Sequence, residues 1–202
     1  MKRQMKTAAA VLLGCLALVA CKDKEKDNKE SAAAAIEATE SGVWHYFSLT
    51  AGKEVGSGKE SDSANTVWFA RTDWDFAVNK YQIRTNSGEA TSVGSKGGVY
   101  TFADGVSYAG AVLPDGAEFA VDKAITSSGM GGETTVVKSE ATVIVFKTNE
   151  DGSLVMPPVY LKAPVYAFRT ADGLGYYKVE FTQYQNDAGE SGHVEFNFVK
   201  MN

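Results

Sequence analysis

The pattern of apolar and polar residues is most regular near the C-terminal end of the chain. There Tyr177, Val179 and Phe181 alternate with polar residues, which is the period of two that a strand with one buried face shows. Turns rich in Gly and Asn separate this run from an apolar run on either side. We therefore expect an antiparallel meander of three strands, over 165–170, 176–185 and 193–200.

Shorter β-branched and aromatic runs precede this meander and also predict strands. They cover residues 43–49, 66–70, 74–85 and 141–147. A turn is expected at Asn149–Gly152, and the Gly-containing segment 89–98 is expected to be a loop. No stretch of ten residues after residue 40 has the 3.6-residue period of a helix. The pattern predicts an all-β fold, a single predominantly antiparallel β domain over residues 41–202.

The first twenty residues differ from the rest of the chain. Three basic residues are followed by an apolar stretch from Thr7 to Ala20, which is too short to span a bilayer. It ends in Leu18–Cys21, where small residues precede a cysteine as in a lipobox. We expect residues 1–20 to be a lipoprotein signal peptide, with cleavage before Cys21 and acylation of that cysteine, which anchors the chain stably. An ordinary secretory signal with a chance cysteine is the alternative.

Residues 21–40 carry a charged run without aromatic residues, so we expect a lipidated, flexible tether. With Cys15 in the signal and Cys21 acylated, no cysteine remains for a disulfide or a zinc site. The formal net charge of -5 argues against nucleic acid as a partner, because phosphate binding needs a basic face. Contact with a membrane is expected through the lipid anchor only.

Residue types that carry catalysis do not form a recognisable pattern. His45 and His193 each lie within a predicted strand, where a histidine is usually half-exposed and structural. Asp73 and Asp75 flank Trp74, and on a strand they would share a face as surface carboxylates. The chain has no nucleophile elbow, phosphate-binding loop or zinc-protease motif. We therefore do not expect an enzyme.

One segment carries a resemblance to a known family. Residues 74–88 read W-D-F-A-V-N-K-Y-Q-I-R-T-N-S-G, which resembles the HmuY family of haem-binding lipoproteins, the haemophores of Bacteroidetes-type bacteria. The run from Trp44 and the segment Tyr166–Gly173 are similar to that family's first strand and late hairpin, so the resemblance extends over about 43–200. It implies an all-β domain whose long loops form a cleft for haem b, iron protoporphyrin IX.

The resemblance also implies partners and a location. Such lipoproteins take up haem at the cell surface, with host haem proteins as a source, and pass it to a TonB-dependent outer-membrane receptor. Acidic residues after Cys21 resemble the signal that sends lipoproteins to the cell surface in these bacteria. We expect a protein anchored in the outer membrane and facing the exterior. A module of the same fold for another tetrapyrrole or a glycan, without iron ligation, is the alternative.

The iron ligands would have to differ from the pair of histidines in the family's best-known member, because residues 86–164 contain no His. Two methionines lie there, Met130 between glycines and Met156 before two prolines. A thioether is a soft, neutral donor that favours ferrous haem relative to imidazole. Each methionine also has a structural interpretation, Met156 as core filler and Met130 as an exposed loop residue.

Geometry limits the pairing of these two sulfurs. If the strands ran straight around the turn at 149–152, Met130 would lie roughly 50 Å from Met156 at ~3.3 Å per residue. Ligation by both therefore requires the chain to fold back between Met130 and Ala141, for which Lys138–Glu140 is the candidate break. Aromatic residues that could stack on the porphyrin, although their ordinary role is sheet packing, are Tyr100, Tyr108 and Tyr160.

Overall fold

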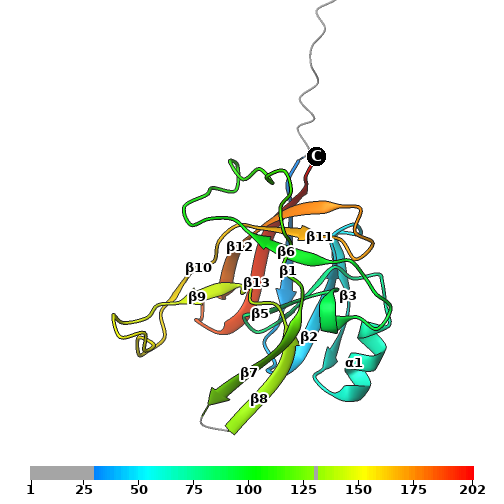
Figure 1. The fold of residues 1–202 in the computed structure, drawn as a ribbon. Coiled ribbons are helices and arrows are strands. Elements are labelled where there is room, and N and C mark those ends of the chain that lie inside the picture. The colour runs from blue at the N-terminus through cyan, green and yellow to red at the C-terminus, as the bar shows by residue number, and fades with distance from the viewer. Residues whose placement is uncertain (1–29, 130–131) are drawn as a thin grey trace, which may run out of the picture.

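The computed structural model describes residues 30–129 and 132–202. Within these residues two antiparallel sheets form the body, and two hairpins project from it (Figure 1). The five-stranded sheet contains, in order across the sheet, β1 (Ala32–Glu37), β13 (Ser191–Lys200), β12 (Tyr176–Gln185), β11 (Tyr166–Arg169) and β6 (Gly98–Thr101). The four-stranded sheet contains, in order, β3 (Lys53–Lys59), β2 (Val43–Ser48), β4 (Phe76–Asn79) and β5 (Gln82–Thr85).

The projecting hairpins and two short helical elements complete the fold. One hairpin consists of β7 (Lys123–Gly129) and β8 (Gly132–Lys138), and the other of β9 (Ile144–Phe146) and β10 (Tyr160–Lys162). The helical elements are α1 (Asp62–Phe69) and the single 3₁₀ turn η1 (Gly88–Ala90). The predicted all-β, predominantly antiparallel fold is confirmed.

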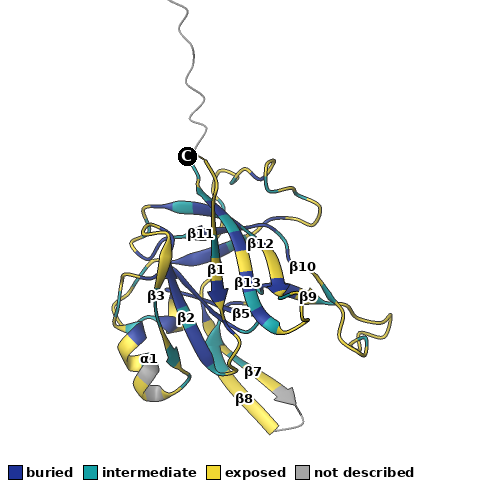
Figure 2. Cartoon of the chain, turned by 180° about the vertical axis from the view of Figure 1, so that it is seen from behind, coloured by how far each residue is buried: buried dark blue, intermediate teal, exposed yellow. Residues whose placement is uncertain are grey.

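The main core lies between the two sheets and is rich in phenylalanine. Phe47 and Phe76 of the four-stranded sheet meet Phe168 and Phe196 of the five-stranded sheet, with the Phe76 and Phe168 ring centroids 5.0 Å apart. Figure 2 shows buried residues following the strands of both sheets. Burial of these rings, together with aliphatic residues such as Leu49, Val78 and Val179, joins the two sheets.

The predicted C-terminal meander is confirmed, and its strands are β11, β12 and β13. Tyr177, Val179 and Phe181 are buried, as their alternation indicates. The alternation ends after Phe181, because the pairing with β13 shifts register there and Tyr184 becomes the next buried residue. The turn predicted at Asn149–Gly152 is also present, closed by the Gly152 N–H donating to the Asn149 carbonyl.

Two predicted strands are wrong in detail. Residues 66–70 belong mostly to α1, in which Trp68 turns inward and stacks on Tyr46 with ring centroids 3.9 Å apart. The helix has only eight residues, which is too short for the 3.6-residue period of a helix to be recognised in the sequence. Residues 74–85 form a hairpin rather than one long strand, because Lys80 adopts a left-handed φ of 53° between β4 and β5.

The predicted tether of residues 21–40 is wrong over residues 32–37. These residues form β1, which pairs with β13 from Ala32 opposite Phe198 to Glu37 opposite His193. Backbone pairing needs little from the alanine side chains, and Ile36 is buried in the main core. The signal, Cys21 and the remaining predicted tether up to residue 29 lie outside the described residues. Among the residues described, no helix is long and apolar enough to cross a membrane.

Candidate functional site

The chain changes direction between the two projecting hairpins. β8 ends at Lys138 and pairs with β7, whereas β9 begins at Ile144 and pairs with β10 in a separate sheet. Between them the Ser139 N–H donates to the carbonyl of Ile83, and the Val143 N–H donates to that of Tyr81. The intervening residues thus run along β5, and the chain then enters β9 in a separate sheet. Ligation by both methionines stays a prediction, because Met130 lies outside the described residues.

Met156 is held out of the β9–β10 hairpin by its local sequence. The Lys147 N–H donates to the Val159 carbonyl at 2.9 Å, and the Lys147 carbonyl accepts from the Val155 N–H at 3.1 Å. Residues 156–158 therefore bulge outward opposite a single residue, and the two prolines have no N–H to offer the facing strand. Met156 is 73% exposed, so its interpretation as core filler is wrong.

Met130 follows Gly129, the last residue of β7, and lies outside the described residues. Of the two methionines predicted as ligands, Met156 is therefore the one that the structure places. The hairpin that leads to Met130 is regular up to its last described pair, with Lys123 opposite Lys138 at the base and Gly129 opposite Gly132 at the end.

The β9–β10 hairpin carries an apolar surface on one face and packs through aromatic rings on the other. Val145 lies opposite Leu161, and both side chains are exposed, as is Val159 just before β10. On the other face Phe146 packs edge-on against Tyr81 of the body, at 4.9 Å between ring centroids. Contiguous exposed apolar residues of this kind mark a binding surface more often than a solvated one.

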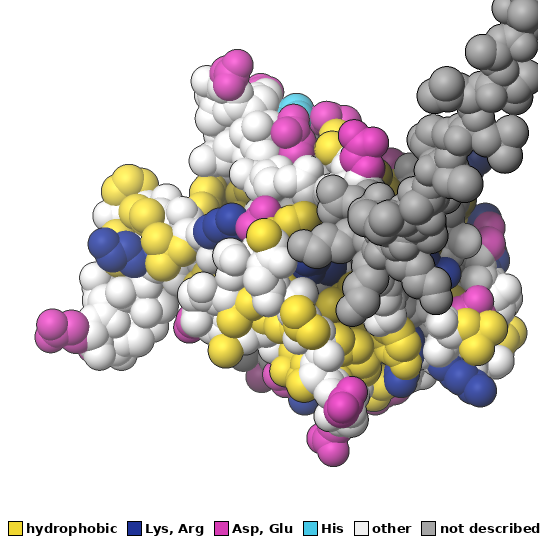
Figure 3. Space-filling model, turned by 90° about the horizontal axis from the view of Figure 1, so that it is seen from above, with side chains coloured by type: hydrophobic (Ala, Val, Ile, Leu, Met, Phe, Trp, Pro, Cys, Tyr) yellow, Lys and Arg dark blue, Asp and Glu magenta, His cyan; other side chains and the backbone are white. Residues whose placement is uncertain are grey.

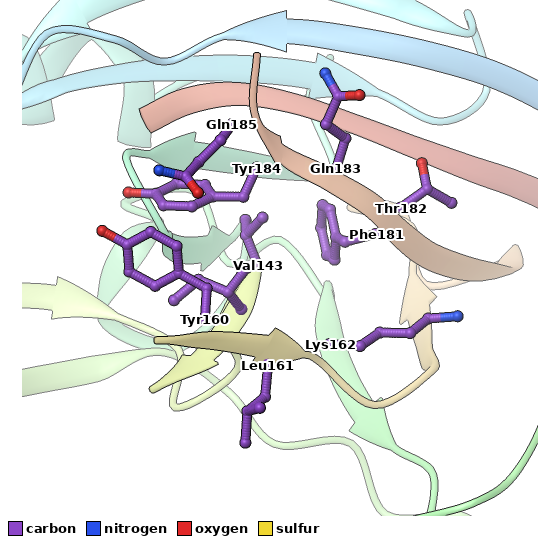
Figure 4. A pocket seen from close by; sticks show the side chains of 10 residues that line it. Val143, Tyr160, Leu161, Lys162, Phe181, Thr182, Gln183, Tyr184 and Gln185 are labelled. Atoms are coloured by element: carbon purple, nitrogen blue, oxygen red, sulfur yellow. The ribbon is translucent and has the colours of Figure 1, made fainter. Parts of the chain in front are cut away.

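Two cavities lie on either side of β10. A cavity of about 430 Å³ separates β10 from β12, with Tyr160 and Tyr184 at one end, their ring centroids 5.2 Å apart, and Lys162 toward the other (Figure 4). A second cavity of about 500 Å³ lies between residues 103–108 and the side of the hairpin that carries Leu161. The ion pair of Lys162 with Glu180, at 2.6 Å, stands between the two cavities.

The three predicted stacking tyrosines do not share one environment. Tyr160 lines the smaller cavity, and Tyr108 lines the larger one, where the Lys178 ammonium lies 4.7 Å from its ring centroid. Tyr100 packs instead against Phe102 and Phe119, in the sheet-packing role that a strand tyrosine ordinarily has. The structure therefore brings Tyr108 and Tyr160 beside the β9–β10 hairpin and leaves Tyr100 in the packed body.

Arg84, in the segment that carries the family resemblance, is fully buried beneath the β7–β8 hairpin. Its guanidinium carbon lies 4.0 Å from the Trp44 ring centroid, and its Nη2 pairs with the Glu60 carboxylate at 2.9 Å. Its Nε–H donates to the Val137 carbonyl of β8 at 2.7 Å. The arginine therefore ties the hairpin to the four-stranded sheet through a bond to the backbone.

Asp122, just before β7, holds the other strand of the same hairpin. Its carboxylate accepts from the backbone N–H of Thr85 at 2.9 Å and from the Thr85 hydroxyl at 2.5 Å. Its own N–H donates to the Ser87 hydroxyl at 3.0 Å. Burial raises the pKa of Asp122 to about 7, although the bonds from Thr85 and the charge of Arg84 oppose that shift. No spacing in the sequence could have indicated these contacts, which join residues 35 or more apart.

Asp75 is not the surface carboxylate that the sequence predicts, since it is only 4% exposed. It accepts from the N–H groups of Leu49 at 2.7 Å and Ala171 at 2.9 Å, joining turns of the two sheets. Burial raises its pKa, and these N–H donors oppose the shift. Asp73 lies at the surface as expected, paired with Arg71 at 2.6 Å.

The two histidines are engaged within strands. His45 in β2 pairs with Glu54 at 3.0 Å, and His193 in β13 pairs with Glu37 at 2.6 Å. Over residues 30–129 and 132–202, no group of three or more His, Cys, Asp or Glu side chains is arranged to hold a metal ion.

Comparisons with known proteins bear on this site. A family model described as HmuY protein matches residues 40–198. A comparison with curated protein sequences finds no match. Among solved structures, the fold is similar to a protein from Bacteroides vulgatus proposed to be a HmuY-like haem-binding protein, with a TM-score of 0.57 and 23% identity over 84% of this chain and 91% of that one.

Two further solved structures share the fold. The apo HmuY analog from Tannerella forsythia has a TM-score of 0.53 and 22% identity, over 87% of this chain and 99% of that one. Apo PinO from Porphyromonas gingivitis has a TM-score of 0.54 and 15% identity, over 86% of this chain and 98% of that one. At these identities the likeness shows the fold alone.

Proposed function

Because the chain belongs to the HmuY family, we propose that it is a haem-binding lipoprotein that captures haem b. The family match spans most of the described residues, and the fold is shared with a protein proposed to bind haem. The uncovered apolar surface of the β9–β10 hairpin supports the proposal, because a porphyrin is bound largely by burial of its apolar faces.

The donor atoms of the chain fit haem iron through thioethers. His45 and His193 lie in strands of the body, paired with glutamates, and neither is on a projecting hairpin. Met156 presents a soft sulfur on an exposed bulge, and Met130 occupies the sequence position between β7 and β8. We propose that these two methionines would hold the haem iron. Bound haem would supply an iron centre that accepts soft neutral donors and cycles between ferrous and ferric states.

The extrusion of Met156 is the observation that carries this proposal. An unbranched apolar side chain gains nothing from exposure to water, and here two prolines following it keep it out of the hairpin ladder. Tyr160, four residues later, offers a ring beside the same hairpin. These residues would bind and orient the porphyrin, and the apolar face of the hairpin would exclude water from it.

We extend the proposal from membership of the HmuY family to a biological role. Cys21 would carry the acyl chains that anchor the protein in the outer membrane, with the domain facing the cell exterior. Host haem proteins would supply the haem, and a TonB-dependent outer-membrane receptor would accept it. The protein would act as a binding protein in this process.

A haem titration of the mature chain tests the proposal. Absorbance in the Soret region should show saturable binding in both oxidation states, with a low-spin spectrum when the iron is reduced. A parallel titration with metal-free protoporphyrin distinguishes a site that ligates haem iron from a site that binds another tetrapyrrole without iron ligation. If the metal-free pigment binds as tightly as haem and the reduced haem spectrum is not low-spin, iron ligation is irrelevant and another tetrapyrrole is the candidate ligand; if neither pigment binds, the proposal fails.

A further inference from the structure

The long loop between β6 and β7, residues 102–122, forms an apolar surface at one end of the molecule. Val112 in this loop is 76% exposed, and Leu113 beside it is half-buried. Phe102 and Ala111 of the loop are buried in one cluster with Val165 and Ala167, so a small core holds the loop against the body. Figure 3, which looks onto this end, shows apolar side chains gathered there. Loops of this length in compact domains usually serve a function.

The described chain begins against this loop. The Ser31 hydroxyl lies 2.8 Å from the Tyr108 hydroxyl, which joins the residues before β1 to the loop. β1 then begins at Ala32, opposite Phe198 near the C-terminal end of β13. Figure 1 shows the loop beside the C-terminus, with α1 and the β7–β8 hairpin at the other end of the molecule.

The length of chain before this point limits how far the loop can lie from an anchored Cys21. Glu30 is the ninth residue after Cys21, so nine residue steps join the two. Fully extended, they span at most about 30 Å. An acylated Cys21 would therefore hold this end of the domain, and not the end with the β7–β8 hairpin, close to the membrane.

We propose that the β6–β7 loop docks on the lipid surface that carries the anchor, with Val112 and Leu113 entering the interface. This inference rests on the lipid anchor of the proposed function. A weak contact is sufficient, because a short tether holds the loop at an effective concentration of about a millimolar or more. Docking would direct the β7–β8 hairpin away from the membrane, toward the source of the ligand.

The charges of the loop define the kind of contact. Its exposed charged residues are Asp104, Asp115 and Glu118, all acidic. Attraction to anionic headgroups therefore cannot drive the docking, and the contact is made by apolar side chains. The contact should accordingly be insensitive to ionic strength, since screening weakens charge interactions and leaves apolar burial unchanged.

The test uses the full lipidated chain in phosphatidylcholine vesicles that contain nitroxide-labelled lipid. An environment-sensitive fluorophore is attached at Val112→Cys. The matched control is Val67→Cys on α1, because Val67 is also an exposed valine, with 59% of its surface accessible. After processing no other free thiol should remain, because Cys15 is removed with the signal and Cys21 is acylated. We expect quenching several-fold greater at position 112 than at position 67, unchanged by added salt.

Each of the other outcomes contradicts a stated part of the proposal. Equal quenching at the two positions in protein that floats with the vesicles overturns the docking, and quenching that salt abolishes overturns the apolar contact. Protein that does not float overturns the anchor and the docking together. Haem titration of the same labelled chains is read separately, so a failure to bind haem refutes the proposed ligand and leaves the quenching result standing.

Discussion

The two projecting hairpins are held at their bases by different chemistry. Buried ionisable side chains, Arg84 and Asp122, hold the β7–β8 hairpin through hydrogen bonds. Aromatic rings, Phe146 and Tyr160, hold the β9–β10 hairpin by edge-to-face packing. Bonds to charged groups are short and directional, whereas ring packing tolerates changes of angle. We infer that buried ionisable side chains fix the base of the β7–β8 hairpin, whereas the side-chain packing of the β9–β10 hairpin leaves it more room to adjust to a ligand.

The largest effect is expected from Arg84→Met. The substitution leaves the Glu60 carboxylate without its buried partner and the Val137 carbonyl without its donor. Because Glu60 is itself 26% exposed, we expect a loss at the lower end of the range for broken buried ion pairs, about 3 kcal/mol in the free energy of unfolding. Denaturant-induced unfolding measures it.

Arg71→Met is the matched control for this prediction. Arg71 also pairs with a carboxylate, that of Asp73, and lies over a tryptophan ring, but at the surface, so its loss should cost less than about 1 kcal/mol. Equal losses in the two variants would refute the view that the β7–β8 hairpin depends on buried charge.

Asp122→Asn should change how stability varies with pH. The folded pKa of about 7 lies above the unfolded value near 3.8, so the folded state favours the protonated acid. The stabilisation is complete below pH about 4 and is lost as pH rises toward 7. Between pH 5 and 7 the wild type should lose roughly 2 kcal/mol relative to the asparagine variant, which lacks this titration.

Unfolding curves of both proteins at several pH values test this. The asparagine amide can still accept from the Thr85 N–H and donate to the Thr85 hydroxyl, so a constant offset between the curves is expected to be small. A wild-type minus variant difference that stays flat from pH 4 to 7 would show that Asp122 is ionised throughout.

Phe146→Ala should have a smaller effect, because this ring is only half-buried. We expect a loss of between about 1 and 2 kcal/mol, below the range for fully buried phenylalanines. Phe146→Leu should recover most of it, since an aliphatic side chain can fill much of the space beside Tyr81. If leucine is as costly as alanine, ring geometry is as strict here as the hydrogen bonds of the other hairpin, and the contrast between the hairpins disappears.

Met156→Ala should have the smallest effect on stability and a clear effect on the haem spectrum. The side chain is exposed, so the free energy of unfolding should change by less than about 0.5 kcal/mol. Loss of the sulfur should alter the reduced spectrum while most of the haem affinity persists, because apolar burial of the porphyrin supplies much of it. Met156→Leu, which keeps the apolar side chain, should give the same spectrum as alanine; a spectrum like that of wild type would exclude Met156 as a ligand.

The alternation of apolar and polar residues predicts those strands that bury one face. The alternation of Tyr177, Val179 and Phe181 gave the correct buried face because each lies on a strand paired on both sides. It could not reveal β1, whose alanines pair through the backbone, or α1, in which Trp68 is the one buried residue among the side chains that the structure describes.

The candidate site likewise has features that the sequence predicts and features that it does not. The proline pair after Met156 is visible in the sequence, and so is the need for a fold-back before Ala141. The roles of Arg84 and Asp122 depend on contacts between residues 35 to 53 apart, which no local pattern records. The stretch by which the chain resembles its family is therefore largely internal support, and the exposed hairpins carry the proposed chemistry.

The pairing of β1 with β13 has a mechanical consequence for a protein held by its N-terminus. Six consecutive residues of β1 join the edge of the five-stranded sheet immediately after the point where an anchored chain would enter the domain. Tension drawn along the strand would load these backbone bonds together and not one after another. Drag from flow, or a pull during transfer of cargo, would thus be shared across the sheet before it reached either hairpin.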